Sequence, residues 1–153
     1  MVKEKELIKL QATTPKSERK YRVGNTFDFN GKKLANMLCY IDARYVMDTL
    51  DKIVGVGNWD NEYFEIKRNL FCKITIRFEK EDGTIGQVSK MDCGTESNVE
   101  KQKGESSDAF KRCAVQFGVA RDLYSSPNYR VEMNEYKGKL YPPKDWKPSV
   151  GSK

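Results

Sequence analysis

Strict alternation of apolar and polar residues between Phe71 and Glu79 is the feature that most restricts the fold of this chain. A period of two indicates a strand with one buried face. The turn signal Glu81-Asp82-Gly83 follows, and the segments 59–68 and 85–92 also resemble strands. We therefore predict an antiparallel three-stranded β-meander packed against helices, an α+β fold. The buried side of the middle strand would hold Cys72, Ile74, Ile76 and Phe78, and the other face of the sheet would present Lys73, Arg77 and Lys90.

Two amphipathic helices are predicted to cover the apolar face of this sheet. The first begins after Asp42, a good N-cap, and ends at Gly55. The second follows a predicted loop at 94–104, is capped by Ser106 or Ser107, and runs to about residue 124, with Gly118 marking a bend or an end. Its apolar stripe consists of Phe110, Cys113, Ala114 and Phe117.

Basic residues gather around the start of this second helix. Lys111 and Arg112 point away from the apolar stripe, and Lys101 and Lys103 precede the helix. Cations beside free backbone N–H groups are typical of a phosphate site. An ordinary core helix with a solvated basic face would show the same spacing, so both interpretations stay open.

Charge is distributed unevenly along the 153 residues, which carry a net charge of +6. The excess lies at the two ends, which suits a polyanionic partner and also keeps a protein soluble. We predict a basic N-terminal arm at 1–33, a core domain at 34–133 and a flexible basic tail at 134–153. Within the arm, 3–12 resemble a short charged helix and 13–33 an extended or mobile segment.

The composition argues against most enzymes. The chain has no histidine, its four cysteines form no CxxC pair, and no phosphate-binding loop of the Gly-x-x-x-x-Gly-Lys type occurs. A nuclease-like cluster of Asp60 and Glu65 would place the two carboxylates on opposite faces of a strand. We expect no catalysis, no cofactor, no metal and no membrane segment, and a cytoplasmic location.

Two motifs carry a resemblance to a known family. One runs from Cys39 to Val46 (Cys-Tyr-Ile-Asp-Ala-Arg-Tyr-Val) and is followed by a helix and by Gly55-Val56-Gly57-Asn58-Trp59. The other is the segment 107–118, with its Asp-x-x-Lys-Arg-x-x-x-x-Phe-Gly pattern. In this order, with three strands between them, they resemble the Rad-fifty-two family of single-strand annealing proteins, and in particular its phage Sak-type and bacterial DdrA-like members.

The resemblance implies a β-β-β-α core whose subunits form rings or helical filaments. It also implies ATP-independent binding and annealing of complementary single-stranded DNA in recombination and repair. Lys111 and Arg112 align with the basic pair of the family's DNA groove, and Lys103 aligns with a basic residue ahead of it. Where the eukaryotic members place a DNA-contacting arginine, this chain has Tyr45, and Arg44 stands one residue earlier.

Implied partners are single-stranded DNA, further copies of the chain, and a phage or host exonuclease or single-strand binding protein. Annealing requires bases that stay exposed, so Phe110 and Phe117 are expected in the core and not as stacking platforms. A passive single-stranded DNA or RNA binding module without annealing would need the same basic groove. That alternative stays open, and a metal-dependent nuclease is the third.

Overall fold

The computed structural model describes residues 1–95, 101–125 and 129–148, the side chains of 101–103 excepted. The chain forms two compact units, each assembled from separate segments of the sequence. The first unit combines residues 1–14 with 42–121, and the second combines 15–41 with 122–153.

An antiparallel sheet of three strands organises the first unit, as predicted. Its order is β3 (Trp59–Ile66), β4 (Asn69–Glu79) and β5 (Ile85–Cys93). A tight turn at Lys67 and Arg68, both at positive φ, joins β3 to β4. The predicted apolar side of β4 is fully buried at Cys72, Ile74 and Ile76.

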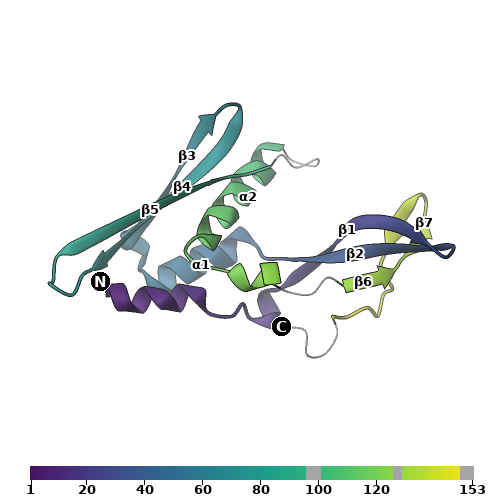
Figure 1. Cartoon of the computed structure of the whole chain (residues 1–153), viewed down its shortest axis with the longest axis horizontal. Coiled ribbons are helices and arrows are strands. Elements are labelled where there is room, and N and C mark those ends of the chain that lie inside the picture. Colours follow the sequence, from purple (N-terminus) through teal and green to yellow (C-terminus); the bar gives the residue numbers. More distant parts are fainter. Residues whose placement is uncertain (96–100, 126–128, 149–153) are drawn as a thin grey trace. The chain divides into compact units, whose positions relative to one another are not determined.

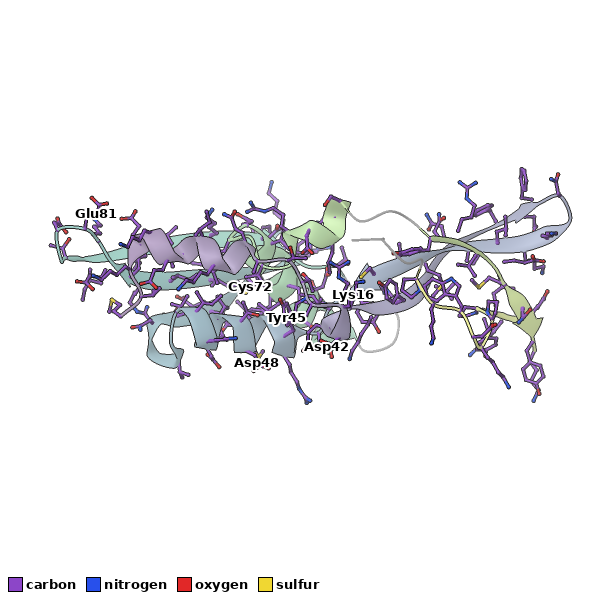
Figure 2. All side chains as sticks on the ribbon, turned by 90° about the horizontal axis from the view of Figure 1, so that it is seen from below. Lys16, Asp42, Tyr45, Asp48, Cys72 and Glu81 are labelled. Atoms are coloured by element: carbon purple, nitrogen blue, oxygen red, sulfur yellow. The ribbon has the colours of Figure 1, made fainter. Side chains whose placement is uncertain are left out.

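Helices lie against this sheet (Figure 1). They are the 3-10 helix η1 (Glu4–Gln11), α1 (Ala43–Ile53), the short η3 (Val56–Asn58) and α2 (Lys101–Val115). Asp42 is the N-cap residue of α1, and Tyr45 and Asp48 follow along that helix (Figure 2). The first helix ends as predicted, because Gly55 takes a φ of 101° that L-residues rarely adopt.

The boundaries of α2 differ from those that the sequence indicates. The helix already includes Lys101, so Ser106 and Ser107 lie inside it and do not cap it. Its last helical residue is Val115, well before residue 124. Gly118, at a φ of 105°, turns the chain toward the 3-10 helix η4 (Arg121–Ser125). Gly118 therefore marks the end of the helix, one of the two outcomes that the sequence left open.

A second antiparallel sheet organises the other unit. It contains β1 (Lys20–Phe29), β2 (Lys32–Tyr40) and β6 (Tyr129–Glu132), in that order. The 3-10 helix η2 (Lys16–Glu18) precedes β1. A two-stranded hairpin of β7 (Asn134–Tyr136) and β8 (Lys139–Tyr141) follows β6.

Apolar and aromatic side chains hold this second unit together. Ala35 and Met37 of β2 are buried with Val131 and Met133. The rings of Tyr21, Tyr129 and Trp146 pack edge to face, with centroids 5.5 to 5.8 Å apart. Such aromatic pairs add roughly 0.5–1.5 kcal/mol beyond the area that they bury.

The segments predicted as a mobile stretch and a flexible tail therefore contribute structure to this unit. Residues 13–33 supply β1 and the start of β2, and the tail supplies β8 and Trp146. A partly buried ion pair also ties the two ends of the unit together, because Arg19 Nη2 lies 3.0 Å from Asp122 Oδ2. Ala35 and Met37 of one end are buried against Val131 and Met133 of the other.

Candidate nucleic-acid interface

The basic helix α2 is fixed to the sheet through its apolar stripe. Phe110, Cys113 and Ala114 are fully buried, as the spacing predicts. The Phe110 ring lies against Trp59, with the ring centroids 6.0 Å apart. The indole N–H of Trp59 donates a 2.7 Å hydrogen bond to Asp51 Oδ1 of α1. The buried Phe110 ring and the half-buried Trp59 ring thus join both helices to the sheet.

Polar contacts tie α2 to neighbouring segments of the first unit and bind its C-terminal end. Glu105 Oε1 accepts a hydrogen bond from the Leu70 backbone N–H at 3.0 Å. Asp108 Oδ2 accepts one from the Thr95 backbone N–H at 2.9 Å, so this carboxylate does not serve the N-terminus of its own helix. At the other end, the Arg121 guanidinium donates to the carbonyls of Val115 and Gln116. These carbonyls are the acceptors that a helix terminus leaves unsatisfied.

Arg112 is an exposed cation of α2. Its side chain is 44% exposed, and its Nε lies 4.0 Å from Asp92 Oδ1 of β5. That distance is at the outer limit of an ion pair, and a pair of this exposure contributes between 0 and about 1 kcal/mol. Lys111 precedes it and is half-buried. The guanidinium of Arg112 therefore stays available to an external anion.

Lys101 and Lys103 belong to the first turn of α2, but their side chains lie outside the described residues. Because α2 already includes Lys101 and ends at Val115, Lys111 and Arg112 lie near its C-terminal end. The prediction that these two cations lie beside the free N–H groups at the start of the helix is therefore wrong. An anion at Lys111 and Arg112 would depend on the side chains and not on the helix terminus.

The open face of the sheet holds Lys73 and Arg77, as predicted. Their β4 side chains alternate with the buried ones, and α2 covers the buried side. Arg77 Nη1 binds Asp60 Oδ2 at 2.8 Å, and Lys73 lies opposite Glu62 in the strand register. Both cations therefore face away from α2, and within the first unit they share no surface with Arg112.

Lys90 does not belong to that open face, and the prediction is wrong here. In the β4–β5 register Lys90 pairs with Ile74, so its side chain projects to the side that α2 covers. Its Nζ donates a 3.1 Å hydrogen bond to the Gln116 carbonyl and lies 5.3 Å from the centre of the Phe117 ring. Lys90 thus binds a backbone carbonyl at the C-terminal end of α2. Phe117 lies beyond the helix and is half-buried, so it does not extend the buried stripe.

Arg44 is exposed in the first turn of α1. Tyr45 follows it and is half-buried. A helix turns by about 100° per residue, so the two side chains leave α1 in different directions. The exposure of Arg44 is compatible with a phosphate contact.

The two fully buried cysteines of the first unit behave as core residues. Hydrogen bonding to Cys113 and burial raise the pKa of the Cys72 thiol, which stays protonated at neutral pH. The Cys113 thiol donates to the Lys90 carbonyl at 3.1 Å. Neutral thiols of this kind pack as small apolar groups.

The nuclease-like carboxylates do not converge. Asp60 and Glu65 are five residues apart on β3 and point to opposite faces, and Asp60 is bound to Arg77. Within residues 1–95, 101–125 and 129–148, no group of three metal-ligating side chains is found. Over the same ranges, no helix is long and apolar enough to cross a membrane.

Sequence reasoning recognised that the two ends are basic but missed that they come together in the second unit. Its two segments carry 12 Lys and Arg against 6 Asp and Glu, whereas the first unit carries 16 of each. The whole net charge of +6 therefore belongs to the second unit. One signal could have revealed the hairpin that presents these cations. Asn30-Gly31, at φ of 50° and 76°, is a sequence that favours a two-residue turn between strands.

Comparison with known proteins identifies the family. The family described as Rad52/22 family double-strand break repair protein matches residues 6–140. The chain belongs to this family, as its motifs indicated.

Two relatives carry the name single-stranded DNA-binding protein DdrA. The one from Deinococcus deserti is 37% identical over 105 residues, which is 67% of this chain and 49% of the relative. The one from Deinococcus radiodurans is 35% identical over 110 residues, covering 70% of this chain and 50% of the relative. The chain thus spans about half the length of the curated relatives that it matches.

Proposed function

We propose that this protein binds single-stranded DNA and anneals complementary strands without a nucleotide cofactor, in DNA repair or recombination. The observation that carries the proposal is the basic helix α2. Its Lys-Arg pair lies within the residues 6–140 that match the Rad52/22 family, and Arg112 is exposed and only weakly paired. The names of both DdrA relatives support single-stranded DNA as the ligand.

Phosphate contacts would come from Arg112 and Lys111, with Lys101 and Lys103 from the first turn of α2 and Arg44 from α1. Cationic side chains hold the backbone without reading bases. A strand held by its phosphates leaves its bases free to pair with a second strand. No bond in the DNA has to break, so the proposed activity needs no catalytic group.

Binding by one subunit rests on few contacts, so we also propose that the protein acts as a homo-oligomer, ring or filament. Linked subunits raise the effective concentration of each further contact. The sheet of the first unit supports this part, because β3 and β5 are edge strands that a neighbour could cover. A phage or host exonuclease or single-strand binding protein is a further proposed partner.

The test is an annealing assay with two complementary labelled oligonucleotides in EDTA, with and without ATP. The proposal predicts annealing above the spontaneous rate in both conditions. Binding without acceleration would establish the passive binding module instead. Cleavage of the DNA on addition of Mg²⁺ would favour the nuclease. Light scattering on the same samples tests the oligomer, and a stable monomer with and without DNA would refute it.

A further inference from the structure

One face of the β1-β2-β6 sheet combines basic and aromatic side chains. The inner face of this sheet holds Tyr21, Val23, Met37 and Val131 and packs against Trp146 and Leu140. Residues that alternate with these project from the opposite side, and side chains extend from both sides of the hairpin in Figure 2. This aromatic–basic face consists of Lys20, Arg22, Phe27, Phe29, Lys32, Leu34, Asn36, Leu38, Tyr40, Arg130 and Glu132.

Charge on this face favours a polyanion. Its four cations are all exposed, and Glu132 is the one carboxylate among its described residues. The Glu132 carboxylate lies 3.8 Å from the Lys32 ammonium, and both side chains are about 60% exposed. A surface pair of this kind leaves the lysine able to bind elsewhere. The surrounding unit carries the whole net charge of the chain, which attracts the same class of ligand.

Aromatic rings lie among these cations. The Arg130 guanidinium is 5.4 Å from the centre of the Phe27 ring, and the Arg22 guanidinium is 5.8 Å from that of Tyr40. Both arginines are thus held at rings while their donors remain at the surface. Phe29 differs from these rings because it is 60% exposed. An exposed phenyl ring beside arginines and lysines can receive a nucleobase on its face.

From this arrangement we propose a second single-strand-binding surface, the aromatic–basic face, in which cations hold phosphates and Phe29 stacks on a base. The ligand is a single-stranded polynucleotide, since a paired duplex buries the base faces that Phe29 would contact. One strongly exposed ring anchors a single base per subunit, so most bases stay free for pairing. The surface uses none of the α2 residues, and it does not depend on the annealing activity proposed above.

The experiment measures the affinity of the full chain for oligothymidylate and for an abasic oligonucleotide of equal length, over a range of salt concentrations. Phe29→Ala should weaken binding to oligothymidylate by about tenfold and leave the abasic strand unchanged, because only the first offers bases for stacking. Arg22→Ala with Arg130→Ala should weaken both. It should also flatten the log–log salt slope by about 1.4, for two lost phosphate contacts on single strands.

Matched controls come from the same unit. Lys33→Ala changes the residue that follows Lys32 in β2. The Lys33 side chain has a similar exposure but lies on the opposite face of the sheet, where it is paired with Glu135. Tyr136→Ala removes a ring that is 64% exposed on β7. Neither control should change affinity or salt slope. Far-UV circular dichroism and melting establish that every variant is folded, which the exposure of the changed side chains leads us to expect.

Three results would overturn the proposal. Unchanged binding of both oligonucleotides to the Phe29 and arginine variants would show that the face binds no nucleic acid. Equal losses for both oligonucleotides in Phe29→Ala, together with a smaller particle in light scattering, would make the face a contact between copies of the chain. Losses of the same size in the two controls would show that the effects are not specific to this face. If these variants fail to bind while Arg112→Ala binds normally, the α2 site fails and this surface stands.

Discussion

Replacement of Arg112 by alanine tests the α2 site most directly. The change should leave the fold nearly intact, because the side chain is 44% exposed and its distance to Asp92 is 4.0 Å. Alanine also has the highest helix propensity. We expect the free energy of unfolding to change by no more than about 0.5 kcal/mol, and the melting temperature by no more than about 2 °C.

Binding should respond differently from stability. One lost phosphate contact lowers the log–log salt slope by about 0.7 on single strands, which corresponds to about fivefold in affinity at 0.1 M salt. The loss should be equal for all base sequences, because phosphates carry no sequence information. An oligomer repeats the loss in every subunit that contacts the strand.

Fluorescence anisotropy at several salt concentrations measures both the affinity and the slope. Arg112→Lys keeps the charge and should keep the slope. Lys80→Ala removes an exposed cation in the β4–β5 turn of the same unit and should bind as the unchanged protein does. If Arg112→Ala binds with unchanged affinity and slope, α2 is a core helix with a solvated basic face, and the site is misassigned.

Three further changes test the fold. Phe110→Ala should cost roughly 3–5 kcal/mol of unfolding free energy in urea titrations, since its ring is fully buried; a loss under 1 kcal/mol would contradict this packing. Gly118→Ala should cost about 1–3 kcal/mol, because φ is 105° and a Cβ would overlap Gln11 Cγ, whereas Gly57→Ala meets no atom within 4 Å and should be close to neutral. Burial raises the pKa of Tyr21 to about 12, so the folded state holds its proton above the ordinary pKa of 10. Its contribution to stability should therefore be complete below pH 10 and fall between pH 10 and about 12, and Tyr21→Phe should remove that part of the pH dependence of melting.

Local patterns were sufficient for the first unit because its elements carry strong periodicity. The alternation in β4 and the helical spacing in α1 and α2 predict both element type and buried side. Element ends were less predictable. The segment 101–104 resembles a loop in the sequence but belongs to α2. Glu105 and Asp108, which follow it, bind backbone N–H groups outside their own helix, and local spacing does not reveal such contacts.

The face on which Lys90 lies could not be read from β5 alone. Ile85, Val88 and Met91 are spaced by three, so no single face of that strand is apolar in the sequence. Register with β4 decides the matter, since a shift of one residue exchanges the two faces. The paired strands place Lys90 opposite Ile74, on the side that α2 covers.

By itself, the sequence determined the α+β class, the three-stranded meander, the helix α1 and the family. Each of these depends on the spacing of residues close together in the sequence, and that spacing is the same whatever the tertiary structure. Only the tertiary structure decided that the two basic ends form one unit. The strands β2 and β6 are distant in sequence and pair through the buried side chains of Ala35 and Val131. Contacts between such distant segments leave no periodic signal in either one, and so the aromatic–basic face became visible only in the folded chain.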